Sequence, residues 1–493
     1  MGEDDFVSGM DPLERRLAEE RLKNINPDDA KYADASAKVA PYLSADAEWR
    51  GCALVQKVLL ETRVEFGKAE KRHLAEVEAC LDKLSPLNMS LLEKKVTKHD
   101  QLAVIEEIGR YVSEETKALL HPWTTSYDIL DTARAYLFRK AWKEVMRPKV
   151  KEVIGKLCDM AGKPEYLDLL QVGRTHLQDT SPITFGVMLA GYARRLAENI
   201  EECDRAFNGL RGKVSGIVGT GASIEAVIGK DEPDEETRHA LALEFERKTL
   251  EKLGLEPDYT ATQIVQKERL FSVGNGIVCL MSVIANFANR MRILYSSAIG
   301  EVTSRDSKQR LGGSSADAGK NNPVELENIA GTYPIVKSGM IILYAQSETD
   351  LERDLRNSKP ARYEPQLMMT RTYESFVRLS KVLDQLSVND ETMRENLVPV
   401  REKPTEAMTA ITRAYGYIHP EHGVGHDAVK KFARQAQKGG KNLLEVALVD
   451  EHFRAAFETW SDWNQAILRG ELERYIGPAK IKARENIEYA RRV

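Results

Sequence analysis

The sequence predicts an all-α protein, and three observations lead to that prediction. No stretch alternates convincingly between apolar and polar side chains with the period of two that is typical of strands. The β-branched residues form few clusters, although such clusters favour strands. Several stretches with helical periodicity are longer than about 25 residues, which exceeds the average globular helix. Helices of this length favour a long central bundle that packs within a subunit and between subunits.

The composition excludes several classes of protein. A chain of 493 residues is long enough for several domains and a large buried core. Its 71 basic and 76 acidic side chains give a net charge of -5, which argues against a general nucleic-acid binder. Its five cysteines have no CxxC spacing, so we expect reduced thiols, a cytoplasmic location and no structural zinc. The acidic start of the chain lacks the apolar core of a signal peptide.

We expect an N-terminal helical domain over residues 1–120. Its first 30 residues are charged and weakly patterned, and they suggest a helix with a ragged start. Ser44 has the side chain and the position of an N-cap for the helix that follows it. Helical periodicity covers residues 44–64, 68–83 and 89–118. The segment 121–128, which contains proline and several hydroxyl residues, then interrupts the pattern.

We expect a central domain of long helices over residues 121–368. One helix begins at Ile129, and a connector follows over residues 165–175. The next helix is indicated by apolar residues that recur every three or four positions from Met188 to Phe207. Further helices are expected over residues 234–253, 267–299 and 325–350. The small-residue segment 212–229 lacks the lysine and hydroxyl pair of a phosphate-binding P-loop, so we exclude that interpretation.

The stretch from Leu270 to Asn289 contains no charged residue and has about the length needed to cross a bilayer. It also contains two glycines and several serines and asparagines. A helix that is buried in a large bundle explains this composition better than a membrane span. The remaining residues, 369–493, are expected to form a C-terminal helical domain with glycine-rich turns at 423–425 and 439–440.

One polar loop, residues 312–323, carries groups that suit catalysis. Its three glycines and its Asn-Asn-Pro end cannot form a stable helix interior. Ser314 and Ser315 supply hydroxyls, and Lys320 and Asn322 supply donors that could stabilise a developing negative charge. The plainer interpretation is a flexible surface loop. No GxSxG elbow surrounds the serines, so a hydrolase nucleophile is not indicated.

Three of the nine histidines, His99, His121 and His176, lie beside hydroxyl or acidic residues where the helical pattern begins or breaks. A single histidine in such a place is more often structural, but three together favour a function. No HExxH or similar spacing occurs, so we expect no metal site. Arg353, with Arg356, Arg362 and Ser358, could clamp a phosphate or a carboxylate, and the plainer alternative is a solvated helix end.

Three separated blocks resemble the fumarase/aspartase superfamily of lyases. The first block is Thr125-Ser126 with Asp128 and Asp131-Thr132-Ala133. The second is Gly173-Arg174-Thr175-His176-Leu177-Gln178 with Pro182 and Phe185-Gly186. The third is Gly313-Ser314-Ser315 through Lys320-Asn321-Asn322-Pro323. Their order and spacing cover about residues 50–390. The resemblance implies an all-α homotetramer whose sites combine residues of three subunits.

Other residues resemble the adenylosuccinate lyase subfamily in particular. Lys98-His99-Asp100 resembles the basic residue, histidine and aspartate of those enzymes. The spacing of Arg353, Ser358 and Arg362 matches the residues with which they hold a nucleotide phosphate. Lys31-Tyr32 lies where the subfamily has Arg-Tyr. The resemblance implies a lyase that releases fumarate from adenylosuccinate and from the related succinyl-carboxamide ribotide, without a cofactor.

The resemblance also implies roles for individual residues. Ser314 would be the general base, His176 the general acid, and Glu327 the partner that holds the His176 ring. Lys320 and Asn322 would stabilise the charged intermediate. The substrate-binding residues implied are Lys31, Tyr32, Lys98, His99, Asp100, Thr125, Ser126, Thr175, Gln263, Ser315, Arg353, Ser358 and Arg362.

Two departures from the subfamily affect the expected substrate. Asp317-Ala318 replaces the usual Met-Pro of the third block, which puts an acid into a loop that would close over an anionic substrate. Trp123 replaces the usual glycine after His121. One alternative is therefore a superfamily lyase with another succinyl substrate, such as argininosuccinate, aspartate, malate or a specialised metabolite. The other alternative is a non-catalytic helical scaffold, which the retained catalytic residues disfavour.

Overall fold

The computed structural model describes residues 11–26, 28–304, 317 and 320–493, and most of these are helical. The chain divides into two compact units. Unit 1 comprises Met1–Val150, Asn199–Ser282 and Gly331–Val377. Unit 2 comprises Lys151–Glu198, Val283–Ala330 and Arg378–Val493. The three-domain division expected from the sequence stays a prediction.

Five helices continue from one unit into the other. They are α11 (Arg147–Ala161), α13 (Phe185–Asn208), α16 (Glu268–Tyr295), α17 (Val324–Tyr344) and α19 (Glu364–Gln385). Three of them exceed 21 residues, in agreement with the long helices that the periodicity predicted. The expected bounds of α13, 188 and 207, lie within three residues of the observed ones, whereas α16 and α17 end before the expected residues 299 and 350.

The other helices and strands of unit 1 are short or of medium length. In chain order they are α2 (Pro12–Leu22), α3 (Asp28–Lys31), α4 (Ala33–Leu43), α5 (Ala45–Glu65), α6 (Lys71–Glu78), η1 (Leu81–Lys83), α7 (Pro86–Leu92), η2 (Glu93–Thr97), α8 (Asp100–Gly109), α9 (Glu114–Ala118), α10 (Ser126–Ala141), η3 (Trp142–Met146), β3 (Arg211–Gly212), α14 (Ala222–Ile228), α15 (Glu235–Glu251), β4 (Glu256–Pro257), η4 (Ala345–Ser347) and α18 (Ser358–Ala361).

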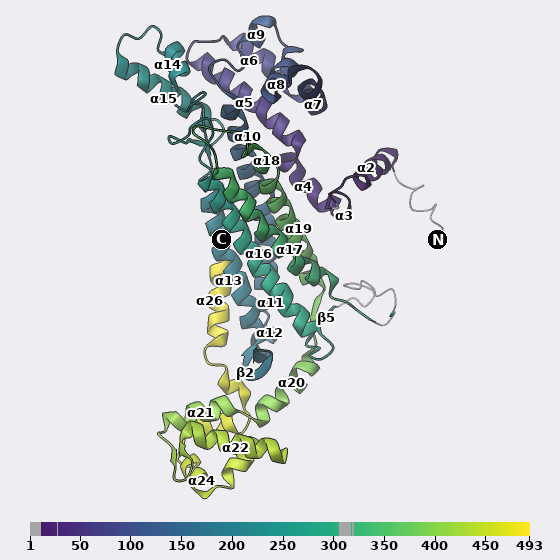
Figure 1. Cartoon of the computed structure of the whole chain (residues 1–493). Coiled ribbons are helices and arrows are strands. Elements are labelled where there is room, and N and C mark those ends of the chain that lie inside the picture. Colours follow the sequence, from purple (N-terminus) through teal and green to yellow (C-terminus); the bar gives the residue numbers. More distant parts are fainter. Residues whose placement is uncertain (1–10, 27, 305–316, 318–319) are drawn as a thin grey trace. The chain divides into compact units, whose positions relative to one another are not determined.

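Unit 1 is built around the contact between α5 and α10, and α6 to α9 gather around α5 (Figure 1). Ser44 caps α5 as predicted, because its side chain accepts a hydrogen bond from the Ala47 backbone at 3.1 Å. Gly51 allows the close approach of the two helices: a Cβ at this position would lie 2.9 Å from Leu137 Cδ1. Leu59 and Ile129 are fully buried in the resulting core.

The expected single helix over residues 89–118 is wrong. The chain forms α7, the π-helical segment η2, α8 and α9 instead. Lys98 has a φ of 54°, in the left-handed region, and this conformation ends η2. His99 then caps α8 with its Nδ1, which accepts from the Leu102 backbone at 3.4 Å. The break therefore turns His99 out of the helical run in which the sequence pattern placed it.

The elements that lie wholly in unit 2 include all the helices after α19. In chain order these elements are α12 (Pro164–Asp168), β1 (Leu170–Thr175), β2 (Gln178–Thr184), β5 (Val302–Ser304), β6 (Leu386–Val388), α20 (Asp390–Glu402), α21 (Thr405–Ala414), β7 (Ile418–His419), β8 (Gly423–Val424), α22 (Gly425–Gly439), α23 (Leu443–Leu448), α24 (Glu451–Phe457), α25 (Asp462–Leu468), η5 (Leu472–Tyr475) and α26 (Ala479–Arg492).

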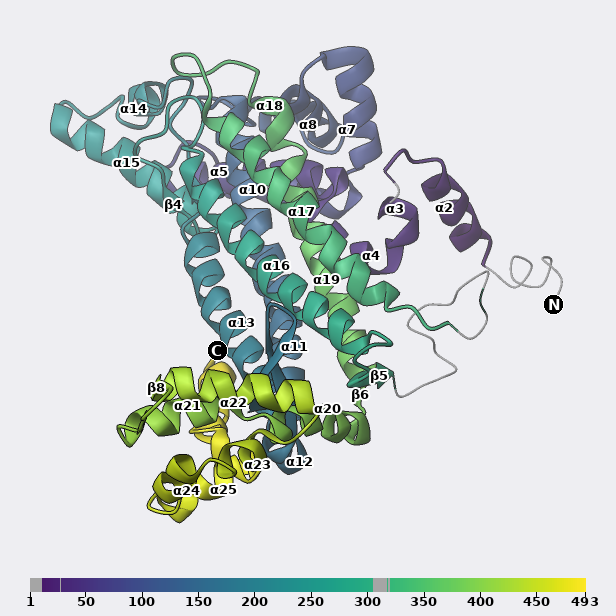
Figure 2. The same ribbon diagram turned by 60° about the horizontal axis from the view of Figure 1, so that its bottom comes forward.

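In unit 2, α21 to α25 form a compact helical group (Figure 2). Its core is rich in aromatic side chains, and Phe453 lies at its centre, in edge contact with Tyr417 and Trp460. The antiparallel hairpin of β1 and β2 contacts α20. The connector expected over residues 165–175 is therefore wrong in part, because a six-residue strand and its partner are too short for a clear alternation.

Among the described residues, one helix, α16, is long and apolar enough to cross a membrane when only length and composition are considered. Its apolar side chains are largely buried inside the structure, among them Leu280, Ile284 and Phe287. Ser272, Asn275 and Asn286 lie on its exposed side. A core helix with one polar face accounts for this distribution, as the sequence interpretation expected.

Candidate active site

Several of the predicted substrate-binding side chains of unit 1 meet in one place, which we call the Arg353 cluster. It consists of His99, Ser126, Tyr127, Gln263, Arg353 and Ser358. Five of these six were singled out from the sequence, and they come from segments that are up to 260 residues apart in the chain. The fold therefore brings together groups that the sequence could only propose one by one.

The start of α10 positions two members of the cluster. Thr125 and Asp128 form a capping box, in which the Thr125 backbone donates to Asp128 Oδ2 at 2.7 Å. Asp128 is completely buried, pairs with Lys213, and accepts a hydrogen bond from the Ser215 backbone at 3.1 Å. These bonds fix the first turn of α10, and with it Ser126 and Tyr127.

His99 reaches Ser126 from the start of α8. Its Nε2 lies 3.1 Å from Ser126 Oγ, while its Nδ1 caps the helix. A neutral ring that accepts at Nδ1 carries its proton on Nε2, so it donates to the serine. The adjacent Asp100 pairs with Arg362 through Oδ2 and Nη2 at 3.2 Å.

Arg353 is the central cation of the cluster. Its guanidinium lies over the Tyr127 ring, 3.9 Å from the ring centroid. Its Nη1 donates to Gln263 Oε1 at 2.9 Å, and its Nη2 lies 3.4 Å from Ser358 Oγ. Within the described residues no carboxylate pairs with it, and its buried Nε has no hydrogen-bond partner. A half-buried cation held only by neutral groups keeps its charge available for an anion.

The two other arginines of the predicted clamp differ from Arg353, because each has an acid partner. Arg356 pairs with Asp350 at 2.7 Å and with Asp354 at 2.8 Å. The hydrogen bond from Arg356 holds the pKa of Asp354 well below its usual range. Arg362 pairs with Asp100. The structure thus separates three arginines that spacing alone treated as equivalent.

His121 and Trp123 lie in a tight turn before α10, with φ values of 64° and 65°. A left-handed φ favours glycine, which the lyase subfamily resembled here usually has at position 123. The buried Arg63 supports the turn: it donates to the Leu119 and Pro122 carbonyls and lies over the Trp123 ring. Burial lowers the pKa of His121 to about 4, so the ring is neutral at pH 7.

Three predicted phosphate-binding or substrate-binding residues are not members of the Arg353 cluster: Lys31, Tyr32 and Lys98. Lys31 ends α3 and is exposed, and Tyr32 caps α4. Lys98 is exposed as well and donates to the Lys94 carbonyl in its own helical segment. Their proposed contribution to a phosphate site remains a prediction.

In unit 2, His176 lies at the tip of the hairpin of β1 and β2. His176 and Leu177 form a two-residue turn with φ values of 54° and 59°, and Thr175 pairs with Gln178 beside them. Both turn residues are in the left-handed region, which is costly for side chains with a Cβ. Thr175 and His176 are exposed, so the turn presents both side chains to solvent.

A buried carboxylate braces the base of this hairpin. Glu301 is completely buried and accepts hydrogen bonds from three side chains. These are Gln171 at 2.9 Å, Arg174 at 2.7 Å and Asn396 at 3.0 Å. Gly173 is needed in the same strand, since a Cβ there would lie 2.4 Å from the Ser181 carbonyl oxygen. We did not single out Glu301 from the sequence, because nothing local marks it as buried.

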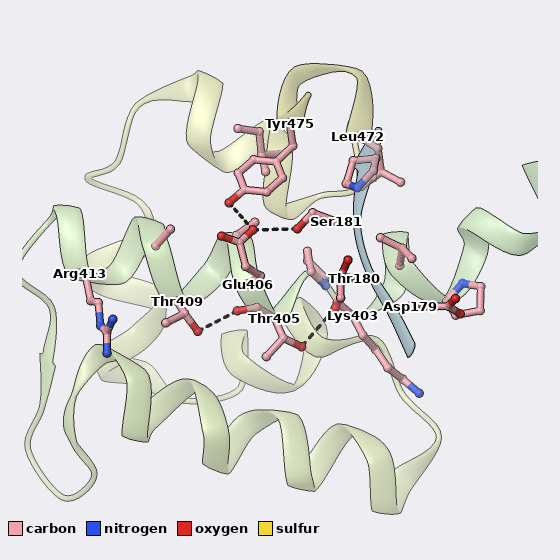
Figure 3. Close-up of a pocket in the computed structure, with 17 residues that line it drawn as sticks. Asp179, Thr180, Ser181, Lys403, Thr405, Glu406, Thr409, Arg413, Leu472 and Tyr475 are labelled. Atoms are coloured by element: carbon pink, nitrogen blue, oxygen red, sulfur yellow. Dashed lines mark hydrogen bonds between the residues drawn. The ribbon is translucent and has the colours of Figure 1, made fainter. Parts of the chain in front are cut away.

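A cavity of about 700 Å³ lies between β2, α20, α21 and η5 in unit 2 (Figure 3). Glu406 joins its walls, because one carboxylate oxygen accepts from Ser181 Oγ at 2.9 Å and from Tyr475 Oη at 2.5 Å. Burial raises the pKa of the Tyr475 hydroxyl. None of the predicted catalytic or binding residues lines this cavity, so it is not the candidate active site.

Three of the remaining catalytic candidates lie near the start of α17, and one of them, Asn322, is half-buried. Lys320 is exposed, and Glu327 is exposed in the first turn of the helix. Ser314 and Ser315 lie outside the described residues. In the part of the chain that the structure describes, no hydrogen bond or ion pair joins His176 to Glu327 or to Lys320, and no group of three or more metal-ligating side chains occurs. Unlike the Arg353 cluster, these groups are not assembled with one another.

The family model described as "Lyase" matches residues 43–336, which is more than half of the chain. The chain is 26% identical over 475 residues to the adenylosuccinate lyase of Archaeoglobus fulgidus, an alignment that covers 95% of this chain and 99% of that protein. It is 28% identical over 396 residues to the adenylosuccinate lyase of Pyrococcus abyssi (79% of this chain, 80% of that protein).

Solved structures confirm the helical-bundle fold. A fumarate lyase from Mesorhizobium sp. BNC1 superposes with a TM-score of 0.75 at 20% identity, over 92% of this chain and 97% of that chain. The 3-carboxy-cis,cis-muconate lactonizing enzyme of Pseudomonas putida gives the same TM-score and coverage at 17% identity. The sequence motifs, the fold and the family model agree: the chain belongs to the lyase family and is a lyase enzyme.

Proposed function

We propose that the chain is an adenylosuccinate lyase. It would release fumarate from adenylosuccinate to leave AMP, and from succinyl-aminoimidazole-carboxamide ribotide in purine biosynthesis. Relatives that align over most of the chain carry that name. The observation that carries the proposal is Arg353, a cation without an acid partner among the described residues, held beside Ser358 where a phosphate would bind.

The proposed reaction is a β-elimination that breaks the C–N bond of the succinyl-amine. Ser314 removes the proton from the carbon beside a carboxylate, and Lys320 and Asn322 stabilise the doubly charged intermediate. His176 gives its proton to the leaving nitrogen, and Glu327 favours the charged form of that ring.

The proposed binding roles are those that the resemblance implies for the groups of unit 1. Arg353 and Ser358 bind the phosphate, and Thr125, Ser126 and Gln263 bind the carboxylates that become fumarate. His99, whose Nε2 lies 3.1 Å from Ser126 Oγ, would contact the phosphate or the succinyl end of the substrate. Arg362 and Asp100 form a salt bridge beside this set.

We also propose that the active enzyme is a cytoplasmic homotetramer. Among the described residues, His176, Lys320 and Glu327 are exposed, and no hydrogen bond or ion pair joins His176 to the other two, which suits a site that is completed by other copies of the chain. Subunit complementation tests this assembly. His176→Ala and Ser314→Ala variants, each inactive alone, should regain part of the wild-type activity when they are mixed and allowed to exchange subunits. A mixture that stays inactive, or an enzyme that is active as a monomer, would contradict the shared site.

The substrate is tested by absorbance at the fumarate and nucleotide bands. Purified protein is given adenylosuccinate, with argininosuccinate, aspartate and malate in parallel assays. Rapid conversion of adenylosuccinate alone supports the proposal. Conversion of another compound alone refutes the substrate but keeps the elimination chemistry.

A lyase that acts on another succinyl compound is the second candidate, and one observation favours it. Asp317 is exposed in the loop that carries Ser314 and Lys320, and its charge would oppose a dianionic substrate. An Asp317→Met variant discriminates the two candidates. If adenylosuccinate is the natural substrate, the enzyme already tolerates Asp317, and the variant should change kcat/KM for adenylosuccinate by less than about threefold. A large gain would favour the second candidate.

A further inference from the structure

Tyr127 was not singled out from the sequence, but it contacts two of the proposed phosphate-binding residues. Its side chain is only 3% exposed. Its hydroxyl lies 2.8 Å from Ser358 Oγ, and its ring lies beneath the Arg353 guanidinium. It stands between Ser126 and Asp128 in the first turn of α10, so the capping box fixes its backbone independently of its own side chain.

The hydroxyl of Tyr127 determines the direction in which Ser358 donates. Arg353 can only donate to Ser358 Oγ, because a guanidinium has no acceptor. Either hydroxyl of this pair can be the donor, but a phenol is more acidic than an aliphatic hydroxyl, which favours the arrangement in which Tyr127 donates to Ser358. With two donors directed at its oxygen, Ser358 has its own proton left for a third group. That proton and the N–H groups of Arg353 that are not bonded to Gln263 or Ser358 can then donate to one acceptor.

The ring of Tyr127 has a separate effect on Arg353. The guanidinium is half-buried without a carboxylate partner among the described residues, which costs solvation energy. The negative face of the ring offsets part of this cost without neutralising the charge. A carboxylate in the same place would stabilise Arg353 more strongly but would compete with an incoming anion. Gln263 acts in the same neutral manner at the other edge of the guanidinium.

We propose that Tyr127 is a positioning residue that presents the Arg353 guanidinium and the Ser358 hydroxyl as a paired donor set for a phosphate group. Its ring holds the plane of Arg353, and its hydroxyl orients Ser358. The identification of the anion as a nucleotide phosphate rests on the proposed function. The presence of a prearranged anion site rests only on the contacts of Tyr127, Arg353 and Ser358.

The first test measures the binding of inorganic phosphate and of AMP to the full-length protein by isothermal titration calorimetry. Tyr127→Phe removes the hydroxyl alone and should raise both dissociation constants about fivefold, the effect of one hydrogen bond. Tyr127→Leu removes the ring as well and should raise them more than about tenfold. Tyr136→Phe is the matched control, since Tyr136 is also on α10 and also has a cation, Lys140, at its ring. The control should stay within about twofold of the wild type.

The second test separates positioning from a purely structural role. For adenylosuccinate, Tyr127→Phe should raise KM about fivefold while kcat stays nearly constant. For the succinyl nucleoside without its phosphate, the same variant should match the wild type. An equal loss on both substrates would overturn the proposal, because the hydroxyl would then act on the whole site rather than on the phosphate contact.

Two outcomes distinguish this inference from the proposed function. Wild-type protein that binds phosphate, loses that binding in Tyr127→Phe, and does not convert adenylosuccinate would refute the proposed function and retain the anion site. If the wild type converts adenylosuccinate and Tyr127→Phe binds phosphate as tightly as the wild type, only the role proposed for Tyr127 is refuted. Circular dichroism checks that each variant is folded, and the Phe variant suffices for the decision if the Leu variant does not fold.

Discussion

The two units of the molecule differ in whether their predicted functional side chains contact one another. In unit 1 the Arg353 cluster is joined by hydrogen bonds and by an aromatic contact between its members. In unit 2 His176, Lys320 and Glu327 are exposed, and no described contact joins His176 to the other two. One set is assembled within a single chain, and the other is presented on its surface.

This difference follows from what each set would do. Groups that bind a substrate gain affinity when they are held in place before it arrives, because less conformational entropy is lost on binding. Groups that transfer protons must change charge, and a catalytic assembly can be completed only when the substrate and a closing loop exclude water. The comparison predicts that substitutions in unit 2 abolish turnover and leave anion binding intact, whereas substitutions in unit 1 weaken binding.

The largest effect is expected for His176→Ala. Loss of a general acid should lower kcat by ~10²–10⁴-fold. Phosphate binding to the Arg353 cluster should not change, and the fold should survive, since the His176 side chain is exposed at the hairpin tip. Steady-state kinetics and calorimetry measure the two quantities. His239→Ala, which removes an exposed histidine from α15, is the control, and a wild-type kcat in His176→Ala would exclude this residue from the mechanism.

A large loss of stability is expected for Glu301→Gln. The substitution breaks a buried ion pair with Arg174, and breaking such pairs costs about 3–5 kcal/mol. Urea unfolding followed by circular dichroism measures the change. Asp179→Asn removes the exposed partner of the same arginine and should cost less than about 1 kcal/mol. Equal effects of the two variants would show that Glu301 does not brace the hairpin.

The three arginines near residue 350 should differ in their effect on KM. Arg353→Ala removes a cation without an acid partner and should raise KM for the nucleotide about 10–100-fold, the range of hydrogen bonds to charged groups. Arg362→Ala should raise KM less, because Asp100 already offsets part of that charge. Arg356→Ala should change KM less than about twofold, since Asp350 and Asp354 pair with that arginine. A reversed order in the initial-rate kinetics would contradict the assignment of the anion site to Arg353.

The last prediction concerns pH and Glu246, whose partner Val214 follows Lys213, the residue that pairs with Asp128. Burial raises the pKa of Glu246 from 4.5 to about 7, and its carboxylate accepts from the Val214 backbone at 2.8 Å. The folded state therefore binds a proton more tightly than the unfolded state between these pH values, so this group contributes less stability as the pH rises. Relative to Glu246→Gln, the wild type should lose up to about 1.4 kcal/mol of unfolding free energy per pH unit in this window.

Urea unfolding at intervals from pH 4 to 8 measures this difference. The difference between the two proteins should level off about one pH unit below 4.5 and about one pH unit above 7, because both states then have the same protonation. A difference that does not change with pH anywhere in the range would show that Glu246 titrates normally in the folded state.

The sequence by itself determined the helical fold, the order of the long helices and the family. Periodicity marks long helices well, since an apolar stripe such as that from Met188 to Phe207 is repeated over many turns. The N-cap at Ser44 was predictable because capping is a local hydrogen bond. The lyase family was predictable from three blocks of motifs, and the family model confirms it. Short elements such as β1 and the π-helical η2 give no comparable signal.

Only the tertiary structure decided which side chains act together. Spacing could not show that Arg353 has no acid partner among the described residues while Arg356 and Arg362 each have one, because the acid that pairs with Arg362 is 262 residues away. It could not show that Tyr127, which has the pattern of a buried helical residue, contacts Ser358 231 residues later. Burial, pairing and the directions of hydrogen bonds depend on segments that meet only after the chain folds, so they are properties of the packed molecule rather than of any local stretch of sequence.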